Sequence, residues 1–273
     1  MFINTASKKV ATGAARLFPR ISKAKLHQVA LIPYSTEEGL DPLFSQSALE
    51  LLYNERQTKL INNVNRLVSN TPLENESLLS IIGKTAGIPD KAALYNNSSQ
   101  AWNNDFFLQT LTSDKRSVGE DIKNVIAIQF DGFDMFQMAF AASANNIFGN
   151  GWTWLLMDRE GRLSITNTYN SGSPFALFPT ITDSYTLHGS HSPVVIPTNT
   201  SYTDPNTAQR PFGKTAWSFQ RFYPILCLNV WQEAYLLDYG LNKSSYIDNF
   251  WKVVNWDIVR QRLFKNVGIT SRP

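Results

Sequence analysis

The chain has 273 residues, 43% of them hydrophobic, and a formal net charge of +3, so it suits one large domain or two small ones with a sizeable core. No run approaches the roughly 18 uninterrupted apolar residues of a transmembrane helix, and we therefore expect no membrane partner. The single cysteine, Cys227, excludes an intramolecular disulfide and a zinc site made of CxxC pairs.

The first 36 residues carry the excess positive charge. They contain six lysines and arginines, apolar residues at helical spacing and no acidic residue. Such a leader is typical of a mitochondrial transit peptide, which we predict over residues 1–30 and which implies the mitochondrial matrix. The alternative is a basic arm that binds nucleic acid. Without those six cations the chain has 19 basic and 22 acidic residues, so any RNA contact would depend on local patches.

Helical periodicity follows the leader. Residues 46–68 and 90–111 each form a helical segment, and both are long enough to pair as an antiparallel hairpin. We predict this hairpin as a domain of residues 31–115. Residues 117–149 predict one or two further helices, with Gly132 as the break between them.

The period then changes to that of strands. Residues 151–170 predict two short strands around the polar turn DREG, and residues 221–230 predict a third strand. The next residues lead through a turn into the start of a helix, and residues 246–264 predict a closing helix. Helices, a small sheet and then helices indicate an α+β chain.

One segment interrupts this second half, which we predict as a domain of residues 116–273. Residues 178–220 are rich in Pro, Ser, Thr, Asn and Gly and lack a clear period. This composition predicts an insertion, either a long ordered loop or a partly disordered segment.

Five sequence blocks stand in a fixed order between residues 31 and 264: LIPYSTEEGLDPLFS, QAWNNDFF, FGNGWTWLLMDREGRLSITNTYNSGSP, LNVWQEAYLLDYG and YIDNFWKVVNWDIV. Together they resemble the iron/manganese superoxide dismutase family. The resemblance implies that family's fold, an N-terminal helical hairpin followed by a mixed domain with a three-stranded antiparallel sheet and flanking helices.

The resemblance also implies a metal site, whose ligands this sequence lacks. The family holds its ion with three histidines and one aspartate. The corresponding residues here are Leu52 (or Leu51, since the alignment is uncertain by one), Asn104, Asn229 and Glu233. Leucine offers no electron pair, and a neutral amide is a poor substitute for imidazole or carboxylate. We therefore expect no metal, no other cofactor and no catalytic residue.

The family's subunit contact has changed as well. Its glutamate beside the last ligand reaches across a twofold interface, and here that position is Gln232. Two copies of Glu233 facing each other would repel, which favours a different, related chain as the partner. The predicted interface with that partner comprises Asn229, Gln232, Glu233 and Leu236.

A mitochondrial leader, a dismutase-like fold and a missing metal site resemble the superoxide dismutase-like proteins of the fungal mitochondrial small ribosomal subunit. The resemblance implies a structural, non-enzymatic subunit that supports mitochondrial translation and contacts neighbouring ribosomal proteins. Contact with rRNA would be limited, and its candidates are Arg260, Arg262 and Lys265 in the basic C-terminal segment.

Two alternatives remain open. A redox metalloenzyme would have to recruit replacement ligands, such as Glu233 with His188 or His191 from the insertion. A free mitochondrial protein would instead bind a small molecule in the emptied cavity. The tryptophans could form a platform for stacking bases, but in this family they belong to the packed core.

Overall fold

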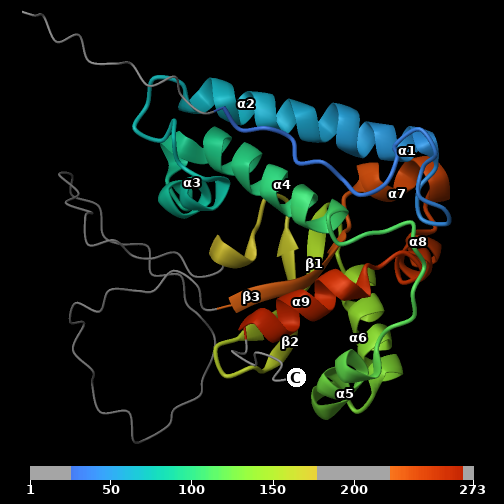
Figure 1. Ribbon diagram of the computed structural model, residues 1–273. Coiled ribbons are helices and arrows are strands. Elements are labelled where there is room, and N and C mark those ends of the chain that lie inside the picture. The colour runs from blue at the N-terminus through green and yellow to red at the C-terminus, as the bar shows by residue number, and fades with distance from the viewer. Residues whose placement is uncertain (1–25, 177–221, 267–273) are drawn as a thin grey trace, which may run out of the picture.

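The computed structural model describes residues 26–176 and 222–266 (Figure 1). The predicted insertion and most of the predicted leader lie outside these residues. The described chain has the predicted α+β architecture, with a helical hairpin above a three-stranded sheet and further helices around the sheet.

The first arm of the hairpin is one continuous run of helix. It consists of α1 (Gln46–Glu50), a π-helical segment (Leu51–Gln57) and α2 (Thr58–Val68). Ser45 begins the run, because its side-chain oxygen accepts a hydrogen bond from the amide of Ala48 at 3.2 Å. The second arm, α4 (Ala92–Leu108), packs beside α2.

The connection between the two arms contains a helix that was not predicted, α3 (Leu78–Thr85), followed by the 3-10 turn Pro89–Lys91. Ser77 caps α3 by accepting a hydrogen bond from the amide of Ser80 at 3.2 Å. The helix buries Ile81 and Ile82 and packs on α4.

The second half begins with two helices, α5 (Glu120–Phe130) and α6 (Phe133–Asn145). Between them Asp131 has φ 57° and Gly132 has φ 126°, conformations in which an L residue other than Asn, Asp or Gly is strained. The predicted break at Gly132 is confirmed.

The sheet consists of β1 (Gly151–Asp158), β2 (Leu163–Tyr169) and β3 (Phe222–Asn229), antiparallel in the order β2-β1-β3. The predicted DREG turn joins β1 to β2, with Gly161 at φ 79°. A bulge opposite Leu155 and Leu156 shifts the pairing of β3 near Pro224. Proline is compatible with this position because β3 is an edge strand and proline has no N–H to donate.

The C-terminal part forms α7 (Gln232–Tyr239), α8 (Lys243–Phe250) and α9 (Trp256–Asn266). The prediction of a single helix over residues 246–264 is therefore wrong. Between α8 and α9 the backbone pairs with the residues that follow α4: Thr112 N donates to Val253 O and Asn255 N donates to Thr110 O, each at 2.8 Å. These long-range bonds replace the helical ones.

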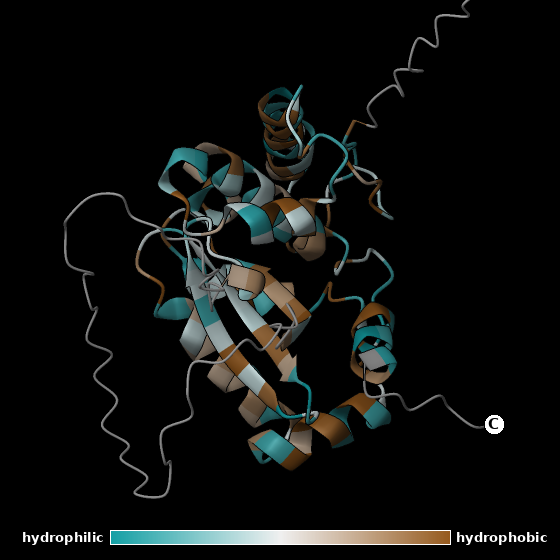
Figure 2. Ribbon diagram, turned by 90° about the vertical axis from the view of Figure 1, so that its left-hand side faces the viewer, coloured by the Kyte–Doolittle hydropathy of each residue, from teal (hydrophilic) through white to brown (hydrophobic). Residues whose placement is uncertain are grey.

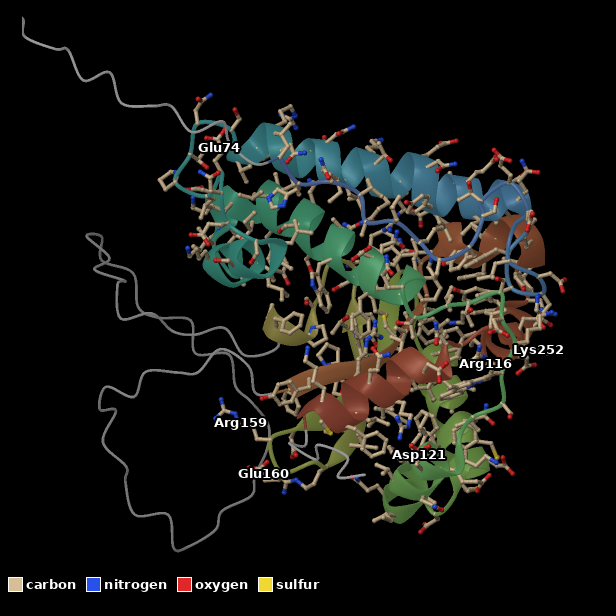
Figure 3. All side chains as sticks on the ribbon, viewed as in Figure 1. Glu74, Arg116, Asp121, Arg159, Glu160 and Lys252 are labelled. Carbon is tan, nitrogen blue, oxygen red and sulfur yellow. The ribbon has the colours of Figure 1, made fainter. Side chains whose placement is uncertain are left out.

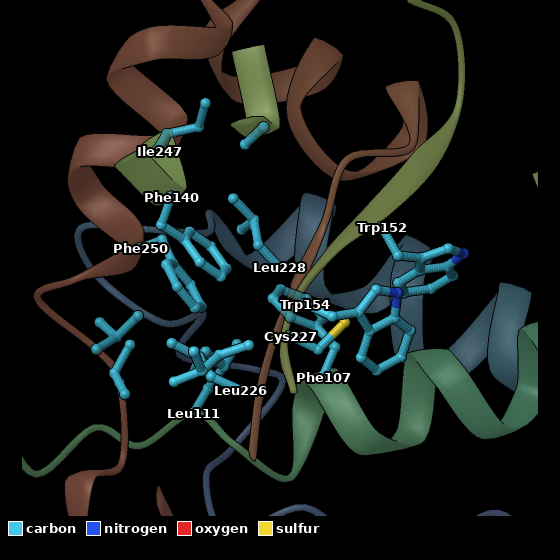
Figure 4. Packing of buried hydrophobic residues seen from close by; sticks show 14 of the residues in the cluster. Phe107, Leu111, Phe140, Trp152, Trp154, Leu226, Cys227, Leu228, Ile247 and Phe250 are labelled. Atoms are coloured by element: carbon cyan, nitrogen blue, oxygen red, sulfur yellow. The ribbon is translucent and has the colours of Figure 1, made fainter. Parts of the chain in front are cut away.

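The main core lies where the sheet meets the surrounding helices. β3 contacts α4 and α9, while α6 contacts β1 and β2. Trp152 and Trp154 are fully buried, and their indole N–H groups donate to Asn170 O at 3.0 Å and Thr168 Oγ1 at 2.9 Å. Figure 4 shows these indoles beside further buried residues, among them Phe107, Phe140, Leu226, Cys227, Leu228, Ile247 and Phe250.

The hydropathy colouring shows apolar and polar residues alternating around most helices, as expected for helices with one buried side (Figure 2). Within residues 26–176 and 222–266, no helix is both long enough and apolar enough to span a bilayer.

Candidate functional site

Three of the four positions expected to correspond to metal ligands meet in the protein interior. Leu52, Asn104 and Asn229 have fully buried side chains, contributed by the π-helical segment, α4 and the end of β3. The fourth, Glu233, stands in the first turn of α7 with 43% of its side-chain surface exposed.

The buried positions are joined by hydrogen bonds between side-chain amides. Asn229 Nδ2 donates to Asn104 Oδ1 at 3.2 Å, and Asn104 Nδ2 donates to Gln57 Oε1 at 3.0 Å and to Leu52 O at 3.3 Å. Gln57 Nε2 donates in turn to Ala101 O at 2.9 Å. We call Gln57, Asn104 and Asn229 the amide network.

Gln57 was not among the predicted site residues, although its side chain is 2% exposed. It lies on a helix whose sequence pattern predicts only an amphipathic surface, so no local signal distinguishes it from a solvated glutamine. The π-helical segment that ends at Gln57 contains one residue more per turn than an α-helix.

The amide network does not fit an iron or manganese ion. The Leu52 side chain has no atom that could bind a metal. Each amide oxygen of the network already accepts a hydrogen bond, and Asn229 Oδ1 accepts its bond from the backbone N–H of Trp231 at 2.9 Å. Carboxylate and imidazole, the ligands these ions require, are absent from the network. In the part of the chain that the structure describes, no three His, Cys, Asp or Glu side chains are grouped closely enough to hold a metal.

A largely buried cation, Arg56, stands beside Glu233. The Arg56 side chain is 11% exposed, and its Nε is 4.0 Å from Glu233 Oε1. Its Nη2 donates to Gln100 Oε1 at 2.8 Å, and its guanidinium stands 4.6 Å from the ring centroid of Trp231. Burial lowers the pKa of Arg56, and the carboxylate of Glu233 opposes that shift. A fixed guanidinium here would also repel a metal ion.

The predicted partner interface is only partly at the surface. Gln232, Glu233 and Leu236 are exposed on α7, but Asn229 is fully buried in the amide network. Asn229 is therefore unavailable to a partner, which corrects the expected set. The sequence did not indicate this burial, because Asn229 ends a strand and its amide is paired only through the tertiary fold.

The predicted RNA contacts also differ in their surroundings. Arg262 Nη1 donates to Thr110 Oγ1 at 2.6 Å and to Ile225 O at 3.2 Å, and its guanidinium stacks 3.6 Å from the centroid of Phe106. Burial lowers its pKa to about 10. Arg262 therefore stabilises the packing of α9 on the sheet and is a poor candidate for an RNA contact.

The other two cations of that set lie nearer the surface. Arg260 forms an ion pair with Asp121, whose side chain lies where α5 approaches α9 (Figure 3). Lys265 is exposed near the end of α9. His188 and His191, the ligands that a replacement metal site would need, lie outside the described residues.

Family models match both halves of the chain. The model "Iron/manganese superoxide dismutases, alpha-hairpin domain" matches residues 26–112, and the model of the C-terminal domain matches residues 118–184 and 200–262.

Similar proteins carry two different names. "Small ribosomal subunit protein mS43" of Schizosaccharomyces pombe is 30% identical over 242 residues, which cover 85% of this chain and 83% of that protein. "Superoxide dismutase [Fe]" of Coxiella burnetii is 29% identical over 229 residues, covering 84% and 93%. The protein of that name from Escherichia coli K12 is 27% identical over 239 residues, covering 86% and 97%.

Proposed function

Because this chain belongs to the iron/manganese superoxide dismutase family, we propose that it keeps the family's fold without its metal chemistry and serves as a structural component of the mitochondrial small ribosomal subunit. The observation that carries this proposal is the amide network at the ligand positions. A relative that is 30% identical over 85% of this chain is a small ribosomal subunit protein, which supports the ribosomal part of the proposal.

The chemistry of the network supports a non-enzymatic role. Redox cycling at iron or manganese needs several anionic or strongly donating ligands around one open position. Asn104 and Asn229 use their amide oxygens to accept N–H groups inside the protein, and Leu52 fills its position with hydrocarbon. These residues hold α4, the π-helical segment and β3 together, which is a structural task.

The location and the RNA contact belong to the same proposal. The basic leader, residues 1–30, would direct the chain to the mitochondrial matrix, where it would support mitochondrial translation. Among the predicted RNA contacts, Lys265 and the partly neutralised Arg260 remain, so the contact with rRNA would be limited. Most of the binding would come from protein neighbours.

The exposed side of α7 is the proposed contact with a related dismutase-like chain. Gln232, Glu233 and Leu236 lie there, followed by Leu237 and Leu241, which are 57% and 93% exposed. Arg56 partly compensates the charge of Glu233, so repulsion between two copies of Glu233 is weaker than the sequence suggested. A heterodimer remains our proposal, because Gln232 replaces the glutamate of the family's reciprocal contact.

The ribosomal proposal is tested by sedimentation of a mitochondrial lysate on a sucrose gradient, with immunodetection of this chain. We expect it to migrate with the small ribosomal subunit and to stay there in moderate salt. A chain that remains at the top of the gradient would contradict the ribosomal role. Metal analysis of the purified protein tests whether the chain has lost the family's metal chemistry, and we expect no stoichiometric iron or manganese.

The second candidate is a dismutase with replaced ligands, favoured by the similarity to bacterial iron superoxide dismutases. It would need Glu233 together with His188 or His191. Near-stoichiometric metal together with activity would establish it. A binding site for a small molecule has less support, because Leu52 and hydrogen-bonded amides fill the ligand positions. Shifts in melting temperature with a panel of metabolites would test that alternative.

A further inference from the structure

Helix α6 is apolar on both its inner and its outer side. The inner side packs into the core through Phe136 and Phe140, which are fully buried. The outer side carries exposed residues at the spacing i, i+3, i+4 and i+7, which places them along one face of the helix: Met135, Met138, Ala139 and Ala142. We call these four residues the outer face of α6.

The outer face exposes large side chains. Met135 is 52% exposed and Met138 is 65% exposed, while Ile128 near the end of α5 is 82% exposed. A single exposed apolar side chain is ordinary, but a helix with apolar residues on two opposite sides is normally covered on both of them. Methionine is enriched at protein–protein interfaces, where its flexible thioether adapts to a partner.

Negative charge borders this surface. Asp131 and Asp134 are exposed at the turn between α5 and α6 and at the first turn of α6. Neither forms an ion pair with any described residue.

Three cations on neighbouring elements have partners of their own. Lys123 on α5 pairs with Glu120 at 2.7 Å, and Arg260 on α9 pairs with Asp121. Lys243 on α8 donates to backbone carbonyls at the other end of α6. Within residues 26–176 and 222–266, the two acids beside the apolar surface thus have no ion-pair partner.

We propose that the outer face of α6 is a docking surface for an amphipathic helix of a neighbouring protein. The apolar side of that helix would cover Met135 and Met138, and lysines or arginines at its edge would meet Asp131 and Asp134. The two acids disfavour RNA, since they would face phosphates, and a second copy of the chain, since like charges would meet. This proposal requires that the chain is part of an assembly, as proposed above.

The occupant is tested by methionine oxidation. Hydrogen peroxide is applied to the isolated protein and to the gradient fraction that holds the chain in its assembly, and sulfoxide is quantified by mass spectrometry. In the isolated protein, Met135 and Met138 should oxidise at least about tenfold faster than Met157, which is 2% exposed and serves as the internal control. In the assembly, oxidation of Met135 and Met138 should fall by at least about fivefold.

A charge variant tests the recognition. Asp131→Asn with Asp134→Asn removes both charges, and asparagine tolerates the left-handed backbone of residue 131. We expect this variant to lose the protection of Met135 and Met138, whereas Asp248→Asn, at an exposed acid on α8, should keep it.

Several results would overturn the proposal. Equal oxidation of both methionines in the isolated and assembled chain would show that nothing covers them. Protection already present in the dilute isolated protein would assign the cover to this chain itself. Loss of protection after nuclease treatment would assign it to RNA, and protection retained in the double variant would exclude recognition by charge. By contrast, a chain that is absent from ribosomal fractions but protected in another assembly would support the docking surface and refute only the ribosomal role.

Discussion

Asn104 is the central residue of the amide network, and its replacement tests whether the network stabilises the fold. Its amide accepts from Asn229 and donates to Gln57, and all three side chains are at most 2% exposed. Asn104→Leu keeps a similar volume and removes every polar atom of the side chain. The variant then leaves two buried side-chain atoms, Asn229 Nδ2 and Gln57 Oε1, without these partners, and Leu52 O also loses its bond from Asn104 Nδ2.

The expected cost follows from that count. A buried polar group that loses its partner costs about 1–3 kcal/mol, so the two side-chain atoms alone predict a loss of about 2–6 kcal/mol. Domains are stable by only about 5–15 kcal/mol, so the effect would be large. The double variant Gln57→Leu with Asn104→Leu removes both partners of one hydrogen bond. Its loss of stability should therefore be smaller than the sum of the losses of the two single variants, by a coupling energy of about 0.5–3 kcal/mol.

The assay is urea unfolding of the purified chain, followed by tryptophan fluorescence, with the transition midpoints compared. Asn62→Leu is the matched control, since Asn62 is exposed on α2 and its replacement should change stability by no more than about 0.5 kcal/mol. An Asn104→Leu variant as stable as the Asn62→Leu variant would refute the structural role of the network, and strict additivity in the double variant would refute the pairing with Gln57.

Three further substitutions test other parts of the structure. Lys243→Met removes an ammonium that donates to three carbonyls at the C-terminal end of α6 at 2.9–3.1 Å, and we expect it to lower the stability in thermal unfolding by about 1–3 kcal/mol. The control Lys252→Met, at an exposed lysine, should not have this effect. Arg262→Met should destabilise the protein by about 2 kcal/mol and leave its affinity for RNA in filter binding unchanged; weaker RNA binding at normal stability would contradict the buried role. Asn229→Asp places a carboxyl at a fully buried position, where burial should raise its pKa in the folded state, so the variant should lose little stability below about pH 4 and more as the pH rises. A loss of stability that stays constant in urea unfolding from pH 4 to 8 would contradict this reasoning.

The order of the elements could be predicted from the sequence because it depends on local signals. The DREG turn and the break at Gly132 require backbone conformations that glycine adopts readily, and both are present. The prediction of one closing helix over residues 246–264 was wrong because the interruption depends on long-range contacts. The apolar spacing continues through Val253 and Val254, which are buried although they lie outside a helix, so periodicity alone could not reveal the interruption.

The position of the candidate site could be predicted from the sequence, but the hydrogen bonds within it could not. The resemblance identified Asn104 and Asn229 as former ligand positions, and the structure brings them into hydrogen-bonding contact. The resemblance could not identify Gln57, because the role of this residue depends on hydrogen bonds to Ala101 and Asn104, which follow it by 44 and 47 positions in the sequence. The same limit applies to Arg262, since a cationic side chain in a sequence pattern does not show whether it faces water or an aromatic ring.

The amide network also explains how the fold persists without metal ligands. Removing a metal from a core leaves its polar ligands unpaired, and each unpaired group would destabilise the protein. Here the amides at these positions form hydrogen bonds with one another and with the neighbouring backbone, so their polar groups are paired within the protein. Surface residues can then bind other proteins without affecting these hydrogen bonds, and we expect the apolar outer face of α6 to be one such binding surface.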